Sequence, residues 1–151
     1  MTTITPFLWF DNNADEAIAF YSRLFPDAVT IDESRGPDGT LFFATFELAG
    51  QRIMALNGGP NFAFTEAISL FVSVDTQEEV DVLWDALTAD GGEESQCGWL
   101  KDKYGLSWQI IPTALGRLQS GPDREKAGRV IQTMLGMRKI VIAELEAAYA
   151  G

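Results

Sequence analysis

The feature that most constrains the fold is an internal repeat over the first hundred or so residues. Asp11 and Asp75 each close an apolar run, at a separation of 64 residues. Gly50 and Gly105 each break a two-strand segment, at a separation of 55. Between these markers, matching acidic, aromatic and aliphatic residues recur at a separation of 63: Glu16, Tyr21 and Leu24, then Glu79, Trp84 and Leu87. The repeat predicts a duplicated fold with a cleft between or within the copies.

Each copy reads as a strand, a helix and three further strands. Asn13 and Glu16 form a capping-box-like start to apolar residues at helical spacing, which Pro26 ends. Thr76 and Glu79 form a capping box in front of the second helix. The strands are expected at 4–10, 28–35, 41–48, 51–57, 67–74, 93–96, 97–102 and 106–111. The pattern predicts an α+β fold of tandem βαβββ modules.

The two modules, residues 1–60 and 66–112, are expected to form one domain over residues 1–116. A helical tail at 117–151 should follow, with a break at Gly136. Its apolar stripe needs a surface to cover, which is either the sheet of its own chain or that of a second subunit. We expect a homodimer, and both positions of the tail remain open.

Charge and composition argue against two classes of partner, nucleic acids and membranes. The net charge is −11, with −13 on residues 1–116 and +2 on residues 117–151. An acidic body repels phosphate backbones, so no nucleic-acid partner is expected. No apolar run reaches the roughly 18–20 residues that span a bilayer, so no membrane partner is expected. Cys97 is the single cysteine and excludes an internal disulfide, which favours a cytoplasmic protein.

Strand alternation identifies a candidate ligand site. Residues on the strand faces turned away from the helices mix aromatic and polar groups, which is typical of small-molecule sites, although a packed interior would show the same pattern. Asn57 is either a contact or a turn residue, Gln109 orients a ligand or satisfies the backbone, and Trp9 and Trp99 stack on a ligand or belong to the core. The candidate binding residues are Thr5, Phe7, Trp9, Met54, Asn57, Ser69, Phe71, Trp99 and Gln109. No catalytic residue is identified, and Cys97 lacks a histidine base, so a packed thiol is favoured over a nucleophile.

The paired units and the helix sequence Ala17-Ile18-Ala19-Phe20-Tyr21 resemble the vicinal oxygen chelate superfamily, which includes glyoxalase I, extradiol dioxygenases, and bleomycin and fosfomycin resistance proteins. Within it the chain is most similar to the PhnB-like branch, often labelled 3-demethylubiquinone-9 3-methyltransferase. The segments that carry the resemblance are 6–11, 54–60, 97–110 and 129–151.

The resemblance also implies where a metal would bind. Metal-dependent members place His, Gln or Glu at four inward positions, which here fall on Thr5, Met54, Ser69 and Gln109. The chain has no histidine, and only the neutral amide of Gln109 could ligate. We therefore expect no metal and no cofactor. A methyltransferase would need a glycine-rich loop after its first strand, where this chain has Asp11-Asn12-Asn13.

The leading hypothesis is a protein that binds a small, partly apolar molecule on the concave sheet, as bleomycin resistance proteins do. One alternative is an enzyme of the superfamily, an isomerase, lyase or dioxygenase-like protein, with non-standard metal or carboxylate chemistry. A methyltransferase, as the family label suggests, is a second alternative that lacks a cofactor motif. An interaction protein that acts through its tail helices is a third.

Overall fold

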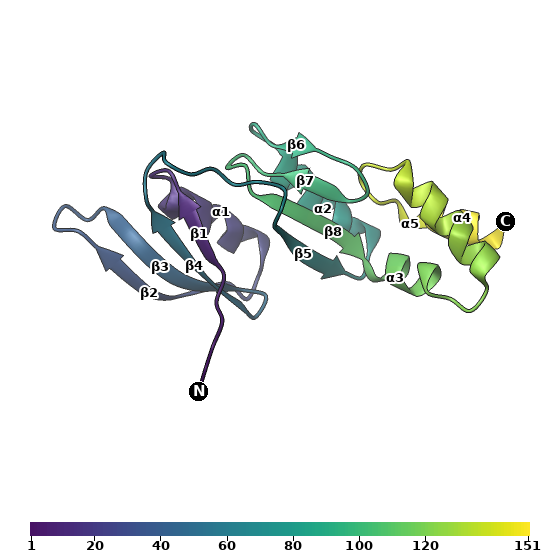
Figure 1. Ribbon diagram of the computed structural model, residues 1–151, viewed down its shortest axis with the longest axis horizontal. Helices are drawn as coiled ribbons and strands as arrows, with labels where there is room; N and C mark the ends of the chain where they lie inside the picture. The colour runs from purple at the N-terminus through teal and green to yellow at the C-terminus, as the bar shows by residue number, and fades with distance from the viewer. The chain divides into compact units, whose positions relative to one another are not determined.

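The computed structural model describes all residues from Met1 to Gly151. The chain divides into two compact units, Met1–Phe64 and Thr65–Gly151 (Figure 1). Each unit contains a four-stranded sheet and a helix that follows the first strand, so the predicted tandem βαβββ modules and α+β class are confirmed. None of the helices combines the length and the apolar character that crossing a bilayer requires.

The first unit is built around one buried helix face. Its elements are β1 (Phe7–Phe10), α1 (Ala14–Leu24), β2 (Val29–Arg35), β3 (Leu41–Leu48) and β4 (Gln51–Asn57). The sheet order is β1-β4-β3-β2, with β1 parallel to β4 and the other pairs antiparallel. Leu8 and Phe10 of β1 and Ile53 of β4 are buried, as is Tyr21 of α1. Alternate residues of the strands therefore form the core with the helix.

The outermost strand of the first sheet has a different character. Six of the seven residues of β2 are exposed, and Asp32, Glu33 and Arg35 lie along it. Its pairing with β3 shifts register between Thr30 and Asp32 and again near Arg35. The strand therefore adds little to the core.

The second unit repeats the order with shorter outer strands. Its elements are β5 (Ser69–Val74), α2 (Gln77–Thr88), β6 (Glu93–Glu94), β7 (Trp99–Lys101), β8 (Ser107–Pro112), α3 (Thr113–Gln119), α4 (Arg124–Leu135) and α5 (Ile142–Ala150). The sheet order is β5-β8-β7-β6, the same topology as in the first unit. Trp84 of α2 and Trp108 of β8 are buried in the core.

The register of the parallel pairs confirms the repeat residue by residue. Phe7 pairs with Met54 in the first sheet, and Phe71 pairs with Gln109 in the second. Met54 and Gln109 therefore occupy equivalent positions, as the sequence predicts.

Several element boundaries differ from expectation. The chain from Ile4 enters β1 only at Phe7, and the strands expected at 93–96 and 97–102 contract to two and three residues. In the tail, α5 begins at Ile142, with Val141 as its N-cap in an extended conformation and Ile140 buried in the tail core. Cys97 and Gly98, with positive φ angles of 59° and 84°, break the strand expected there.

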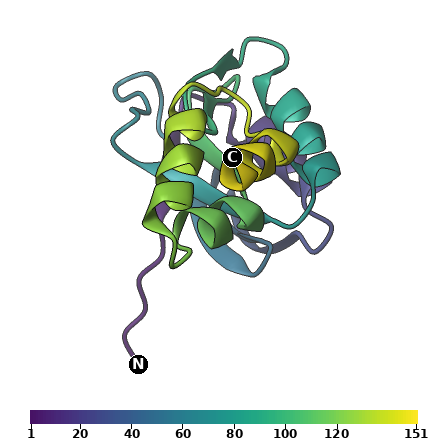
Figure 2. The same cartoon turned by 90° about the vertical axis from the view of Figure 1, so that its right-hand side faces the viewer.

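The three tail helices belong to the second unit, and α3, α4 and α5 gather into one bundle (Figure 2). Their core contains Val130, Met137, Ile140 and Leu145, and it packs on Ile111 of β8. The backbone N–H groups of Cys97 and Gly98 donate to the carbonyl oxygens of Met137 and Arg138, at 2.8 Å each. The apolar stripe of the tail therefore packs against the end of β8 in its own chain, which is one of the two positions that the sequence left open.

Candidate functional site

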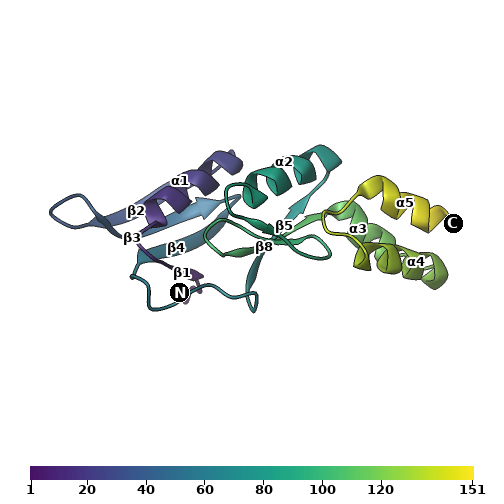
Figure 3. The ribbon, with the colours of Figure 1, turned by 90° about the horizontal axis from the view of Figure 1, so that it is seen from above.

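In each unit the helix lies along one face of the sheet (Figure 3). We call the other side the distal face of that sheet. Phe71 on the distal face of the second sheet is 61% exposed, whereas Val74 on the helix side is buried. Trp108 and Ile110 are buried on the helix side of β8. The exposure of Phe71 and the burial of Val74 agree with the predicted two faces of β5, and in β8 Gln109 is the one residue that is not buried.

Three predicted site residues lie side by side on this distal face. Gln109 of β8 pairs with Phe71 of β5 on one side and with Trp99 of β7 on the other. Paired residues of neighbouring strands point to the same face of a sheet. The register therefore places an aromatic side chain on each side of an amide, from three strands.

A fourth predicted residue touches this group. The Nε2 of Gln109 donates to the Oγ of Ser69 at 2.9 Å. The amide of Gln109 is thus oriented by a hydroxyl group rather than by the backbone, and it is only half-buried. An oriented, partly accessible amide can both donate to and accept from a bound molecule.

A pocket of about 230 Å³ opens beside Trp99, between β6, β7 and β8. Ser107 and Lys101, which pair across β8 and β7, line it together with Glu66 from the segment before β5 and Glu93 of β6. Strand alternation places Ser107 and Lys101 on the same face as Gln109 and Trp99, two residues away along each strand. That signal was present in the sequence, but neither residue was predicted as a site residue.

An ion pair borders the pocket. The Nζ of Lys101 contacts Oε1 of Glu66. This hydrogen bond lowers the pKa of the Glu66 carboxyl group and raises the pKa of the Lys101 ammonium group. Both groups therefore hold their charges at neutral pH.

The pocket depends on the hairpin that joins β7 to β8. Asp102 is buried, and its Oδ1 accepts from the backbone N–H groups of Tyr104 and Leu106 at 2.9 and 3.1 Å. Its Oδ2 accepts from Nε1 of Trp108 at 2.9 Å. One carboxylate thus fixes both the turn and the core side of β8. In the sequence, only the six-residue spacing from Asp102 to Trp108 indicates this arrangement.

The distal face of the first sheet is more completely covered. Nε1 of Trp9 donates to the carbonyl oxygen of Gly59 at 2.9 Å, and its ring contacts Phe62 edge-on at a centroid distance of 5.0 Å. A side chain at Gly58 would meet the ring of Trp9 at 2.3 Å. Residues 58–62 therefore hold Trp9 in place, whereas its neighbour Phe7 is 52% exposed.

The remaining predicted residues of this unit have different settings. Met54 is half-buried on the distal face, and Thr5 precedes β1, next to the Pro6 carbonyl that accepts from the N–H of Met54. Oδ1 of Asn57 accepts from the backbone N–H of Ala14 at 2.9 Å, and its Nδ2 donates to the carbonyl oxygen of Leu41 at 3.0 Å. Both ends of the Asn57 amide are therefore engaged in holding the unit together.

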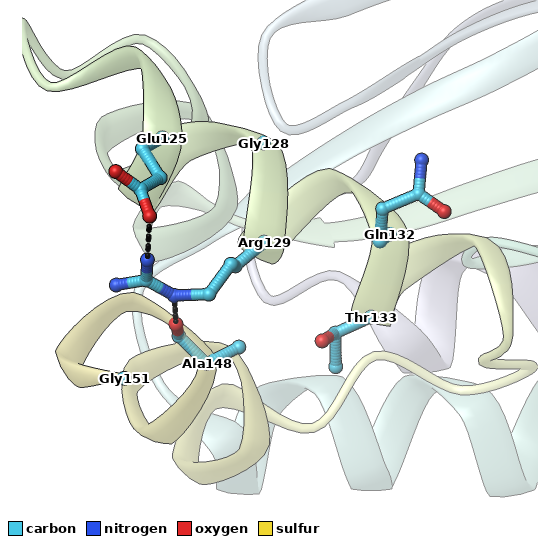
Figure 4. A pocket seen from close by; sticks show the side chains of 7 residues that line it. All are labelled: Glu125, Gly128, Arg129, Gln132, Thr133, Ala148 and Gly151. Carbon is cyan, nitrogen blue, oxygen red and sulfur yellow. Dashed lines mark hydrogen bonds and ion pairs between the residues drawn. The ribbon is translucent and has the colours of Figure 1, made fainter.

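A second hollow, of about 570 Å³, lies between α4 and α5 and contains none of the predicted site residues (Figure 4). Nε and Nη2 of Arg129 donate to the carbonyl oxygens of Ala148 and Tyr149, at 2.8 and 2.9 Å. Nη1 of Arg129 lies 3.7 Å from Oε1 of Glu125. The guanidinium group thus caps the C-terminal carbonyls of α5 and joins two tail helices.

The four residues that the resemblance predicts at metal positions do not form a donor set that fits a transition metal. Two of the four, Ser69 and Gln109, bond to each other, and the other two carry the hydroxyl of Thr5 and the thioether of Met54. Such metals are held by about three imidazole, thiolate or carboxylate donors. No group of three His, Cys, Asp or Glu side chains is placed to hold a metal ion.

Comparison with known proteins identifies the relatives. The family model described as 3-demethylubiquinone-9 3-methyltransferase matches residues 2–111. A PhnB protein from Bacillus cereus that carries the same description is 36% identical, with a TM-score of 0.68 over 74% of this chain and 99% of that one. Among curated proteins, none matches.

Two other solved structures share the fold at low identity. Protein PA1353 from Pseudomonas aeruginosa is 19% identical, with a TM-score of 0.61 over 74% of this chain and 98% of that one. The fosfomycin resistance protein FosX from Listeria monocytogenes, described in complex with Mn(II) and sulfate, is 20% identical, with a TM-score of 0.55 over 72% of this chain and 89% of that one.

The β1–α1 connection of the present chain, Asp11-Asn12-Asn13, lacks the glycines of a methyltransferase cofactor loop.

Proposed function

The chain belongs to the 3-demethylubiquinone-9 3-methyltransferase family, a PhnB-like branch of the vicinal oxygen chelate fold, and we propose that it binds a small, partly aromatic molecule on its distal sheet faces. The observation that carries this proposal is the row of Phe71, Gln109 and Trp99 across three strands of the second sheet. Two aromatic side chains around an oriented amide match the common pattern of ligand sites, which combine apolar walls with a few polar groups.

The exposure of Phe71 supports the same proposal. At 61% exposure, this large apolar side chain gains little from the fold, whereas an aromatic ligand would cover it. Phe7, at the equivalent position of the first sheet, is also exposed and lies beside Met54. Each unit thus presents an exposed aromatic side chain at the same point of its sheet.

Native mass spectrometry of the protein purified from its own host tests the proposal directly. We expect a small molecule to accompany the wild-type chain and to dissociate on collisional activation. Gln109→Ala should reduce its affinity about tenfold, since one hydrogen bond from an oriented amide is lost. Phe71→Ala should reduce occupancy further.

Gln119→Ala is the matched control, because Gln119 is an exposed amide at the end of α3. Its occupancy should equal that of the wild type. Equal occupancy in the Gln109→Ala, Phe71→Ala and wild-type proteins would refute the assignment.

We further propose that the protein is a cytoplasmic homodimer. Exposed apolar side chains on both sheets, Phe7, Phe42 and Phe71, favour association, and the single cysteine suits a reducing compartment. Light scattering coupled to size exclusion should give twice the chain mass of 16.6 kDa. A monomer mass at all accessible concentrations would contradict the dimer.

A further inference from the structure

The pocket beside Trp99 contains an unused buried hydroxyl group. Ser107 is 1% exposed, and its Oγ has no hydrogen-bond partner in the protein. Buried polar side chains almost always have a partner, because an unpaired one loses its bonds to water without replacement. Since Ser107 lines the pocket, a bound group that donates to or accepts from this hydroxyl would satisfy it.

The charges around the pocket are unequal. Three carboxylates, Glu66, Glu93 and Glu94, lie against it with one ammonium group, that of Lys101. Lys101 pairs with Glu66. Glu93, opposite Lys101 across β6 and β7, also helps to raise the pKa of Lys101, but this single ammonium group faces both Glu66 and Glu93, so the pocket retains negative charge.

Glu94 is already committed elsewhere. Its Oε1 accepts from Nε1 of Trp84 at 2.7 Å, and its Oε2 lies 3.6 Å from Nη1 of Arg138. Both of its carboxylate oxygens therefore already have partners, one in α2 and one in the tail. Glu93 is the carboxylate that remains for a ligand.

The third wall is aromatic. Trp99 is half-buried and lines the pocket next to Lys101 and Ser107. Indole faces attract cations more strongly than other aromatic rings do. A metal ion would find a poor donor set in an indole and a neutral hydroxyl, so the chemistry favours an organic cation.

We propose that this pocket binds the ammonium or amidinium group of a small organic cation, which lies against Trp99, donates to Oγ of Ser107 and is balanced by Glu93. The inference rests on the proposed function, because Trp99 belongs to both, and it names the class of ligand: an aromatic or apolar body on the distal face with a cationic group in the pocket. The small volume, about 230 Å³, suits one such group rather than a whole ligand.

Matched probes test the charge requirement on the full-length, ¹⁵N-labelled protein. Benzylamine is cationic at neutral pH, and benzyl alcohol is its neutral counterpart of nearly the same shape. Titration followed by ¹H–¹⁵N correlation spectra should show benzylamine shifting the amides of Trp99, Lys101 and Ser107. Benzyl alcohol should bind at the same place at least about tenfold more weakly, because it lacks the charge.

Two variants identify the groups responsible. Ser107→Ala removes the acceptor and should weaken benzylamine binding about tenfold. Glu93→Gln removes the charge at an exposed position, where it cannot disturb the core, and should bring the affinities of the two probes together. Glu144→Gln, at an exposed position on α5, is the control and should bind benzylamine as the wild type does.

Each other outcome overturns the inference. Equal affinity for the two probes would show that the pocket does not select a cationic group. Unchanged benzylamine affinity in both Ser107→Ala and Glu93→Gln would show the same. Shifts of Phe71 and Gln109 without shifts at the pocket reject the pocket and leave the proposed function standing. Absence of any shift with benzylamine rejects the inference, while loss or retention of the co-purified molecule in Phe71→Ala decides the proposed function separately.

Discussion

The two units use different groups to accept hydrogen bonds from the backbone N–H groups at the start of their helices. In the first, Asn13 occupies the N-cap of α1 but makes no capping hydrogen bond, and Asn57, from the end of β4, accepts from the N–H of Ala14. In the second, Oγ1 of Thr76 accepts from the N–H of Glu79 at 3.2 Å and donates to its carboxylate at 3.0 Å. One copy uses a contact 43 residues away, and the other uses a local capping box.

The register explains the difference. Phe10 pairs with Asn57 at the end of the first sheet, and Val74 pairs with Pro112 at the same point of the second. Proline has no side-chain acceptor, so the second helix must be capped from within its own first turn. A duplicated fold thus preserves the hydrogen-bonding requirement while its sequence changes the group that meets it.

The hairpins that lead into the last strand of each sheet are also stabilised in different ways. The β3–β4 turn consists of Ala49 and Gly50, both with positive φ (48° and 81°), which suits a tight two-residue hairpin. The longer β7–β8 connection depends on the buried carboxylate of Asp102. The first unit therefore relies on backbone conformation where the second relies on one side chain.

Among the variants that test this comparison, replacement of Asp102 should lower the stability most. Asp102→Ala leaves three N–H donors without an acceptor, two of them in buried bonds, and should lower the free energy of unfolding by at least about 3 kcal/mol. Asp38→Ala is the control, because Asp38 accepts from Thr40 in the exposed β2–β3 turn, and it should cost less than about 1 kcal/mol. Urea denaturation measures both. Similar losses in the two variants would show that Asp102 does not hold the hairpin.

The two caps can be compared by removing each. Asn57→Ala leaves a half-buried N–H and carbonyl unpaired and should cost about 2–3 kcal/mol, whereas Thr76→Ala should cost about 1 kcal/mol. Asn57→Asp keeps the acceptor at the start of α1 but turns a carboxylate oxygen toward the carbonyl oxygen of Leu41, so it should still cost at least about 1 kcal/mol. Hydrogen exchange by mass spectrometry should locate each loss in its own unit. A larger loss for Thr76→Ala than for Asn57→Ala would reverse the comparison.

The smallest expected effect on stability concerns the ion pair between Asp81 of α2 and Lys139 of the tail. The hydrogen bond from Lys139, followed by that from Gln77, holds the pKa of Asp81 below its ordinary value. A depressed pKa means that this contribution is present above about pH 4 and is lost as pH falls through the folded value. Asp81→Asn should therefore show a weaker acid dependence of its urea midpoint.

The difference should stay below about 1 kcal/mol, because both side chains of this pair are about a third or more exposed. Asp90→Asn, at an exposed position just after α2 and outside this ion pair, is the control and should show the same pH dependence of its urea midpoint as the wild type. An unchanged pH profile in Asp81→Asn would show that the pair contributes nothing to stability.

The sequence predicted local features well and distant contacts poorly. Thr76 and Glu79 form the expected capping box because both groups lie within one turn. Asn13 and Glu16 show the same spacing, yet the Asn13 side chain makes no cap bond because Asn57, distant in sequence, takes that role. No local pattern reveals which strand end will meet a helix start.

Part of the candidate site likewise follows from local patterns, and part depends on distant contacts. Period-two alternation places Phe71 and Gln109 on one face, and the register then adds Trp99. The pocket requires more than alternation, because Glu66 enters from a connecting segment and β6 is cut to two residues. The position of the tail was likewise undecidable, since an apolar stripe indicates burial without identifying its partner.

The exposed strand β2 has a consequence for behaviour at high concentration. An outer strand presents unpaired backbone groups that can template association with another molecule. Here the acidic pair Asp32 and Glu33, the neighbouring Arg35 and the two register shifts make that border charged and irregular. Neutralising the two carboxylates would remove charge from this border, together with the pairing of Glu33 with Arg35, and would favour ordered aggregation even though the buried core kept all of its contacts.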